Sequence, residues 1–173
     1  MSEKQYRVIF IIIIILVAVL IIVLISVYRN SRIMDKAQNA AKILLRGEAL
    51  DSVIEGKTPY SRSKIRQMLM IRTFNPSRRY VFNPEKNINI GRDTGWNQII
   101  IQDMHVSEKH CKIYKKRNQI ILEDMNSANG TFVRRRLKKI RVEKPMELKK
   151  ADKIYVGDAI IQVYPFYVDT AFM

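Results

Sequence analysis

The feature that most restricts how this chain can fold is an uncharged run of 20 residues near its start, Val8 to Val27, in which Ser26 is the only polar residue. As an α-helix rising about 1.5 Å per residue, this run would extend roughly 30 Å, the thickness of the hydrocarbon core of a bilayer. Because a chain in lipid must satisfy its own backbone hydrogen bonds, a helix is the expected state. The run predicts one transmembrane helix over residues 8–27, after a short tail over residues 1–7.

A cleaved signal peptide is the alternative interpretation, with Lys4 and Arg7 as its basic start. The apolar run is longer than the usual signal core of about 7–15 residues, and no small-residue cleavage site follows it. We therefore expect an uncleaved anchor.

Positive charge around the run predicts its orientation. Two cations precede it, whereas the next twenty residues hold five, namely Arg29, Arg32, Lys36, Lys42 and Arg46. An excess of positive charge marks the cytoplasmic side, so we expect a single-pass protein of the plasma membrane with its C-terminal part in the cytoplasm. The same cations are expected to approach acidic lipid headgroups.

Residues 28–70 are expected to form a basic, partly helical linker. Apolar residues at helical spacing predict a helix that begins at Ser31 and stops near Gly47. A loop is expected from Gly56 to Ser63, and a second short helix is considered for Ser63–Met70.

The remaining sequence, over residues 71–168, predicts an all-β domain. Short β-prone stretches alternate with turn residues and show no convincing helical pattern. About ten to eleven strands in roughly 100 residues favour a β-sandwich, whose functional residues lie on the loops at its ends. Residues 169–173 are expected to be a tail. The predicted strands are Met70–Phe74, Arg79–Phe82, Asn87–Ile90, Gln98–Ile101, His110–Tyr114, Gln119–Glu123, Gly130–Val133, Lys138–Val142, Asp152–Val156 and Ala159–Tyr167.

Charge indicates the chemistry of the partner. Lys and Arg total 31 against 16 Asp and Glu, a net charge of +15, which points to an anionic partner such as phosphorylated protein, acidic lipid or nucleic acid. Cys111 is the only cysteine, so no disulfide within the chain is possible and no cysteine cluster is available for a metal. We expect no metal and no cofactor.

Three predicted loops carry a recognisable set of motifs. Gly91-Arg92 follows one strand, Ser107-x-x-His110 precedes another, and Asn129-Gly130 precedes a third. This set, in this order and spacing, resembles the forkhead-associated (FHA) domain family, and the resemblance covers roughly residues 71–167. It implies an FHA-like β-sandwich that binds phosphothreonine on partner proteins.

The resemblance implies a role for each motif residue. The positions matching Arg92 and Ser107 hold the phosphate, and the position matching Asn129 holds the peptide main chain. The positions matching Gly91, His110 and Gly130 shape the loops. The chemistry is suitable, because a phosphothreonine carries a charge of about −1.5 to −2 at pH 7. A planar guanidinium and a hydroxyl can donate hydrogen bonds to its oxygens.

The peptide-binding positions also include two departures from the family pattern. Glu108 stands where many members have Arg, Lys or Asn, and Ala128 stands where a Thr often donates a hydroxyl. Each is expected to lower affinity by about 1 kcal/mol per lost hydrogen bond. Both keep open a phosphorylation-independent scaffold on the same fold.

The sequence also bears on two other functions. An enzyme is not expected, because Ser107 and His110 lack an orienting acid and a nucleophile elbow. A nucleic-acid-binding module is the remaining alternative, and it would place aromatic and basic residues together on one sheet face. In the preferred interpretation the chain binds no nucleic acid. The preferred function is a membrane-anchored adaptor that recruits proteins phosphorylated by a Ser/Thr kinase.

Overall fold

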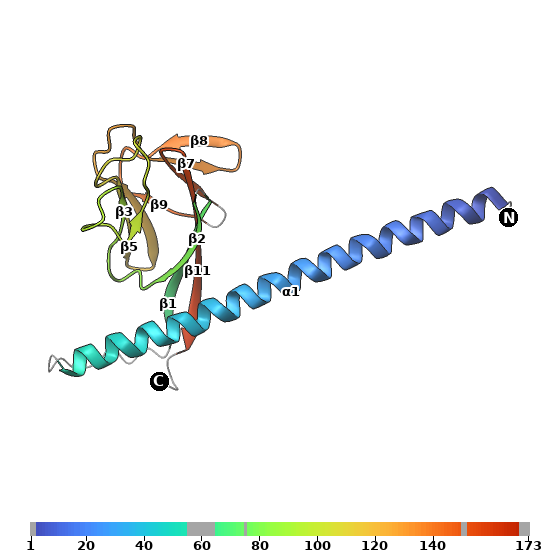
Figure 1. Ribbon diagram of the computed structural model, residues 1–173, viewed down its shortest axis with the longest axis horizontal. Helices are drawn as coiled ribbons and strands as arrows, with labels where there is room; N and C mark the ends of the chain where they lie inside the picture. Colours follow the sequence, from blue (N-terminus) through green and yellow to red (C-terminus); the bar gives the residue numbers. More distant parts are fainter. Residues whose placement is uncertain (1–2, 55–64, 75, 150–151, 170–173) are drawn as a thin grey trace. The chain divides into compact units, whose positions relative to one another are not determined.

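The computed structural model describes residues 3–54, 65–74, 76–149 and 152–169 (Figure 1). The chain divides into two compact units, residues 1–39 and residues 40–173. The first unit lies within a long helix, and the second contains all the strands.

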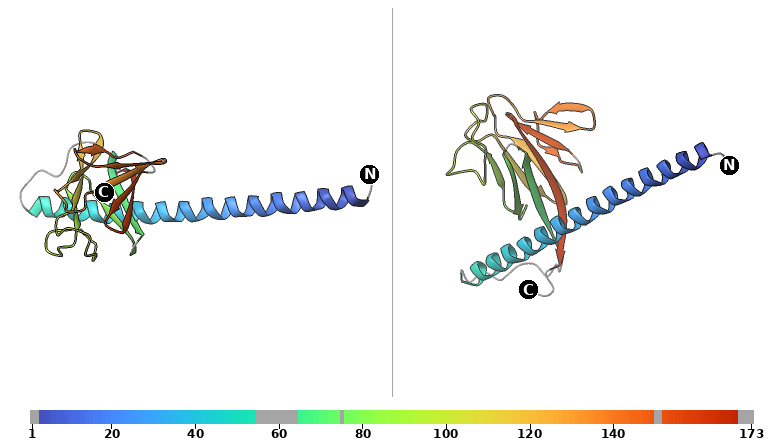
Figure 2. Two further views of the ribbon diagram at one scale, coloured as in Figure 1. Left: turned by 90° about the horizontal axis from the view of Figure 1, so that it is seen from above. Right: turned by 45° about the vertical axis from the view of Figure 1, so that its right-hand side comes forward.

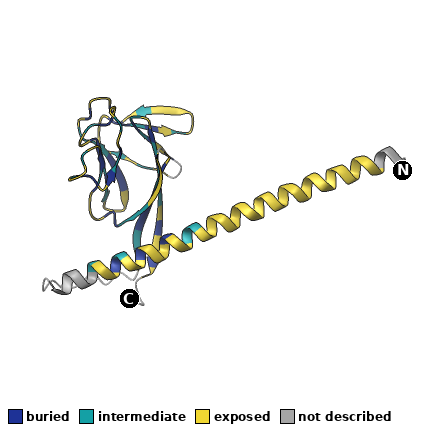
Figure 3. Ribbon diagram, viewed as in Figure 1, coloured by how far each residue is buried: buried dark blue, intermediate teal, exposed yellow. Residues whose placement is uncertain are grey.

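The helix α1 spans Glu3–Ile54, and a long stretch of it is exposed (Figure 3). Residues 6–32 are all exposed, and the most apolar window of the helix reaches a mean hydropathy of 4.1 with none of it buried. The hydroxyl of Ser26 donates to the carbonyl oxygen of Ile22 at 2.9 Å, so the one polar side chain of the run from Val8 to Val27 is satisfied within the helix. Within the described residues, α1 is the one helix long and apolar enough to cross a bilayer.

The structure corrects the sequence prediction of the linker helix. One continuous helix runs from Glu3 through Gly47 to Ile54, rather than a membrane helix followed by a separate helix that stops at Gly47. A Cβ added at Gly47 would meet nothing within 4 Å, so the helix simply accepts the roughly 1 kcal/mol cost of an interior glycine. The predicted loop from Gly56 to Ser63 lies outside the described residues.

The strands form two sheets that pack as a β-sandwich, shown from two further directions in Figure 2. The six-stranded sheet has the order β2-β1-β11-β10-β7-β8, and the five-stranded sheet has the order β4-β3-β5-β6-β9. All the pairs are antiparallel except β3 with β4. The strands are β1 (Ile65–Phe74), β2 (Ser77–Phe82), β3 (Ile88–Gly91), β4 (Ile99–Ile100), β5 (Cys111–Lys116), β6 (Gln119–Asp124), β7 (Phe132–Arg135), β8 (Lys138–Arg141), β9 (Met146–Glu147), β10 (Lys153–Val156) and β11 (Ala159–Asp169).

An aliphatic core lies between the two sheets. Alternate residues of each strand point inward, as Ile113 and Leu122 do from one sheet and Ile154 and Ile161 from the other, and all four are completely buried. Burying side chains of this size contributes about 1.5–3 kcal/mol each, so the core holds the sheets rigidly and fixes the positions of the connecting loops.

The predicted all-β sandwich is confirmed, with two corrections at the level of strands. Each of the ten predicted stretches overlaps an observed strand, but β9 was not predicted. The helix considered for Ser63–Met70 is wrong over its described part, because β1 begins at Ile65 and pairs with β11 from Ile65↔Asp169 to Thr73↔Ile161. The predicted start of the domain at residue 71 therefore falls inside a strand. Pairing with a distant strand overrides the local preference of this segment.

Candidate functional site

Two of the three predicted loops are joined by backbone hydrogen bonds at one end of the sandwich. The N–H of Arg92 donates to the carbonyl oxygen of Ser107 at 3.0 Å, and the N–H of Asp93 donates to that of Glu108 at 3.2 Å. The N–H of His110 donates to Ile90 at 3.0 Å. The segment after β3 and the segment before β5 therefore continue side by side beyond their strands, which fixes Arg92 next to Ser107.

Gly91 allows this close approach. A Cβ built on Gly91 would lie 2.3 Å from the carbonyl oxygen of Glu108 and 2.9 Å from that of Ser107. Both neighbours are backbone atoms already engaged in the pairing, so they have no room to move away. The loop-shaping role expected of Gly91 thus has a steric reason, namely the absence of a side chain.

The side chain of Arg92 is exposed and anchored at one atom. Its Nε donates to the carbonyl oxygen of Val106 at 3.2 Å. Its terminal nitrogens have no hydrogen-bond partner among the described residues. This single bond orients the guanidinium while leaving its forked donors free to hold an anion.

Ser107 and Asn129 connect the third loop, between β6 and β7, to the second. The hydroxyl oxygen of Ser107 accepts a hydrogen bond from the N–H of Ala128 at 3.0 Å, which leaves the hydroxyl proton free to donate. The Asn129 Nδ2 donates to the carbonyl oxygen of His105 at 2.9 Å, which leaves the amide oxygen free. The structure therefore brings all five predicted peptide-binding residues to one end of the sandwich.

His110 lies completely buried beneath the second loop. Its Nδ1 accepts a hydrogen bond from the N–H of Ser107 at 3.1 Å. Burial lowers the pKa of His110 and outweighs the opposing effect of the Asp124 carboxylate. A neutral ring that accepts at Nδ1 carries its proton on Nε2, so His110 supports the loop in its uncharged form.

Asp124 shapes the third loop in a way that the sequence motifs did not reveal. Its carboxylate accepts hydrogen bonds from the N–H of Ser127 at 3.0 Å, from the Ser127 hydroxyl at 2.6 Å and from the hydroxyl of Thr131. Burial alone would raise the pKa of Asp124. The hydrogen bonds together lower it by more than burial raises it, so the pKa of Asp124 lies below its ordinary value. Gly130, in the same loop, adopts a φ of 79°, which favours glycine.

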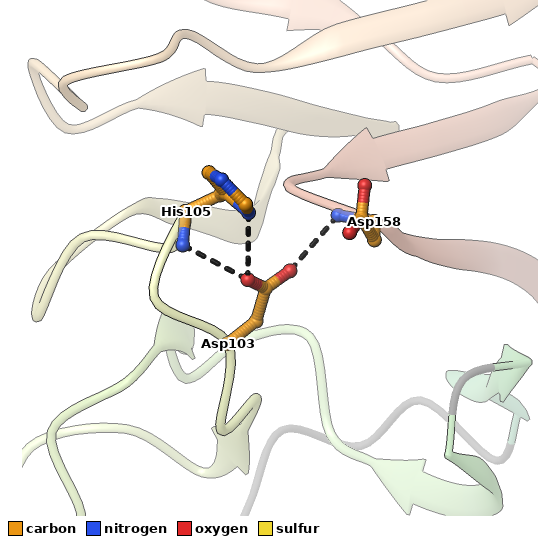
Figure 4. Close-up of side chains that lie close together, drawn as sticks. All are labelled: Asp103, His105 and Asp158. Atoms are coloured by element: carbon orange, nitrogen blue, oxygen red, sulfur yellow. Dashed lines mark hydrogen bonds and ion pairs between the residues drawn. The ribbon is translucent and has the colours of Figure 1, made fainter.

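Asp103 braces the segment before Ser107 (Figure 4). Its carboxylate accepts hydrogen bonds from the N–H of Asp158 at 3.0 Å and from the N–H of His105 at 2.9 Å, and these bonds lower its pKa. The side-chain ligand atoms of Asp103, His105 and Asp158 lie within 4.8 Å of one another. Since both oxygens of Asp103 already bind backbone N–H groups, the arrangement is explained by its role in joining the loop to the β10–β11 turn.

Asn97 is a third brace that the sequence analysis missed. Its buried Nδ2 donates to the carbonyl oxygens of both Asp93 and Glu108, each at 2.7 Å. This double contact fixes the backbone around Glu108 while the Glu108 residue remains exposed. No sequence motif predicted the role of Asn97, because one of its partners lies in the loop after β3 and the other in the loop before β5.

The arrangement is suited to binding an anion rather than to nucleophilic catalysis. A free guanidinium, a hydroxyl donor and a side-chain amide lie together at one end of the sandwich. His110 accepts from the backbone N–H of Ser107 and not from its hydroxyl, so within the described residues Ser107 has no base positioned to activate it.

Comparison with known proteins agrees with this architecture. The family model of the FHA domain matches residues 88–157. An FHA domain-containing protein of Arabidopsis thaliana is 27% identical over 88 residues, which covers 51% of this chain and 22% of that relative. The chain therefore spans about a fifth of the length of the curated relative that it matches.

Three solved structures align with this chain. The solution structure of the FHA domain of an Arabidopsis thaliana hypothetical protein aligns with a TM-score of 0.50 and 23% identity, over 64% of this chain and 95% of that one. The FHA domain of the CT664 protein from Chlamydia trachomatis aligns with a TM-score of 0.48 and 23% identity, over 60% of this chain and 99% of that one. Mycobacterium tuberculosis EmbR, solved in complex with a low-affinity phosphopeptide, aligns with a TM-score of 0.49 and 22% identity, over 56% of this chain and 24% of that one.

Proposed function

Residues 88–157 belong to the FHA domain family, and we propose that this domain binds phosphothreonine-containing segments of partner proteins. The observation that supports this most strongly is the convergence of Arg92, Ser107 and Asn129 from three loops onto one end of the sandwich. Each keeps a free polar group after its structural hydrogen bond has been made.

In this proposal each residue binds a different part of the ligand. The terminal nitrogens of Arg92 hold two phosphate oxygens, since a guanidinium matches phosphate with paired charge-assisted bonds. The Ser107 hydroxyl donates to a third oxygen. The amide of Asn129 holds the peptide main chain. Gly91, His110 and Gly130 shape the loops without contacting the ligand.

Glu108 and Ala128 are expected to moderate the affinity. The exposed Glu108 carboxylate lies next to Ser107 in sequence and would repel a phosphate. The N–H of Ala128 is already bonded to Ser107, and its methyl group offers no hydroxyl to the ligand. We propose modest affinity that is offset by confinement, because two partners at one membrane have a raised effective concentration.

We further propose that α1 anchors the domain in the plasma membrane, with the FHA domain on the cytoplasmic side. The exposed apolar segment, of mean hydropathy 4.1, supports an anchor, and the excess of cations after it supports the orientation. The chain would then act as an adaptor that recruits targets of a Ser/Thr kinase to the membrane, without a catalytic role of its own.

The second candidate is a scaffold that binds partners without phosphorylation. It is favoured by Glu108, which presents a carboxylate at the edge of the site. The two functions are separated by measuring the binding of the purified full chain to paired phosphorylated and unphosphorylated threonine peptides. Binding that requires the phosphate supports the adaptor, and equal binding to both members of a pair supports the scaffold.

A further inference from the structure

The outer face of the six-stranded sheet carries a continuous row of polar side chains, nearly all cationic. Val133, Ile154 and Ile161 point into the core, so the residues next to them along β7, β10 and β11 point outward. The strand register places one outward residue of every strand side by side across the sheet. These six residues, the basic row, are Arg79, Arg72, Gln162, Lys153, Arg134 and Lys139.

The size of the basic row follows from the geometry of a sheet. Neighbouring strands lie about 4.8 Å apart, so the row spans roughly 24 Å. The five cations stand in register rather than in a groove. They form an extended positive surface on the outer face of the six-stranded sheet, whereas Arg92 and Ser107 lie on the loops at the end of the sandwich.

Aromatic rings lie one step along the strands, next to the basic row. Tyr155 pairs with Phe132, and Phe74 occupies the corresponding level of β1. The Nζ of Lys139 lies 4.6 Å from the centroid of the Phe132 ring and 5.4 Å from that of Tyr155. The guanidinium of Arg72 lies 4.3 Å from the Phe74 centroid. The rings therefore order the cations through cation–π contacts.

The cations of the basic row have no ion-pair partner among the residues that the structure describes. The contrast with Arg135 is informative, because this neighbour of Arg134 points to the other side and pairs with the buried Asp152 at 2.7 Å. In addition, the Nε of Arg72 is buried without a hydrogen-bond partner. Like charges directly opposite each other, as in Arg72–Arg79 and Arg134–Lys139, destabilise a sheet. The arrangement therefore carries a repulsive cost, which the cation–π contacts of Arg72 and Lys139 offset only in part.

Two observations favour a lipid surface over a nucleic acid as the partner. Single-stranded nucleic acids stack their bases on free aromatic faces, whereas Lys139 lies over both Phe132 and Tyr155. The turn between β7 and β8 also presents Leu137, which is 90% exposed between Arg136 and Lys138. An apolar side chain flanked by cations suits the boundary between headgroups and acyl chains.

We propose that the basic row, together with Leu137, docks this part of the outer face against anionic phospholipid headgroups. This surface is distinct from the phosphothreonine site, so both can be occupied at once. The proposal rests on the membrane anchor proposed above, because the anchor brings the sheet close to the lipid. It does not rest on phosphopeptide binding. The attraction between cations and an anionic surface is screened by salt, so a contact made by five cations depends strongly on ionic strength.

The test uses the full chain in nanodiscs of phosphatidylcholine, with or without phosphatidylglycerol. A fluorophore is attached to Ser77→Cys, an exposed position beside Phe74 on the outer face; the native Cys111 is completely buried and burial raises its thiol pKa, so it stays unlabelled. Energy transfer to an acceptor on the lipid headgroups reports docking. We expect at least a twofold increase in transfer in the anionic discs and its loss in high salt.

Two sets of substitutions with equal charge change identify the surface. Arg134→Gln, Lys139→Gln and Lys153→Gln together should abolish the increase. Lys116→Gln, Lys144→Gln and Lys149→Gln, at exposed positions outside the basic row, should preserve it. The first set should unfold close to the temperature of the native chain, because the relieved repulsion between neighbouring cations offsets the lost cation–π contacts of Lys139. This measurement separates loss of docking from loss of folding.

Three results would overturn the proposal. The first is equal energy transfer in neutral and anionic discs, and the second is an equal loss of energy transfer in both sets of variants. The third is displacement of the sheet from anionic headgroups by a single-stranded oligonucleotide that binds through the basic row. Failure of the chain to enter the discs would instead contradict the anchor. Sedimentation of the same variants with anionic vesicles would then test lipid binding by the basic row: loss of binding in the first set alone would support it, and equal binding by both sets would contradict it.

Discussion

The hydroxyl oxygen of Ser107 accepts a hydrogen bond from the N–H of Ala128, 21 positions later, at 3.0 Å. This contact joins the loop before β5 to the loop before β7. It uses the acceptor capacity of the hydroxyl and leaves its proton available. One side chain can therefore hold the site together and bind the ligand.

Ser107→Ala should weaken both properties. Loss of the hydroxyl removes the bond to the Ala128 N–H and, in the proposed function, a donor to the phosphate. We expect the free energy of unfolding to fall by about 1 kcal/mol and phosphopeptide affinity to fall by more than this structural loss explains. Urea unfolding and peptide titration measure the two effects. An unchanged affinity would remove Ser107 from the ligand site.

Glu108→Gln should increase phosphopeptide affinity several-fold. The substitution removes a carboxylate near the proposed phosphate position and keeps the backbone carbonyl that accepts from Asn97. Two like charges about 4 Å apart in water repel by roughly 1 kcal/mol, and salt reduces this effect. Titrations at low and high ionic strength check the prediction. An affinity that does not rise at low salt would show that Glu108 points away from the ligand.

Gly91→Ala should destabilise the domain, whereas Gly95→Ala should not. A Cβ at Gly91 would lie 2.3 Å from the Glu108 carbonyl oxygen, but the nearest atom to a Cβ at Gly95 is Asp93 Oδ1, at 3.6 Å. Forcing an extra carbon into a tight contact costs about 1–3 kcal/mol. Thermal unfolding of the two variants compares them directly, and equal stability would refute the close approach at Gly91.

Stability should decrease as the pH falls below about 6.5, through His110. Burial lowers the pKa of His110 in the folded chain below 6.5, so the unfolded chain binds the proton first. The stabilisation is fully present above pH 6.5 and is lost as the pH falls toward the folded pKa. The lowered pKa values of Asp103 and Asp124 act in the same direction, but only below about pH 3.8.

Urea unfolding between pH 7.5 and pH 5 tests this prediction. His105→Gln provides the matched control, because it removes the exposed histidine and keeps the buried one. The control should retain the decrease. A chain whose stability is constant over this range would show that His110 becomes protonated equally easily in both states.

The sandwich was predictable because its strands alternate between inward and outward residues and end at strong turn signals. The missed strand, β9, has only two residues and exists through its pairing with Ile121 and Leu122. The start of β1, residues 65–69, was missed because it contains Arg, Gln and Met, which have no strand preference, and its partner strand is about 100 residues away. Non-local pairing of this kind leaves no local signature.

The site was predictable to a similar degree. Arg92, Ser107 and Asn129 stand in short motifs, so the sequence revealed the groups that remain free for a ligand. The braces Asn97, Asp103 and Asp124 were not assigned, since each acts by accepting or donating bonds to loops that meet only in the folded chain. The basic row was also invisible, because its six members come from six strands.

The central claim is tested most directly by titrating the full chain with a phosphothreonine peptide selected from a library. The measurement compares the native chain with Arg92→Ala, Arg92→Lys and the distant control Lys116→Ala. We expect Arg92→Ala to reduce affinity at least tenfold, about 1.4 kcal/mol, and Arg92→Lys to restore only part of it, since an ammonium cannot bind in a bidentate manner. Lys116→Ala and the native chain should bind alike, and phosphatase treatment of the peptide should abolish binding. Binding that survives both the phosphatase and Arg92→Ala would contradict a phosphothreonine reader.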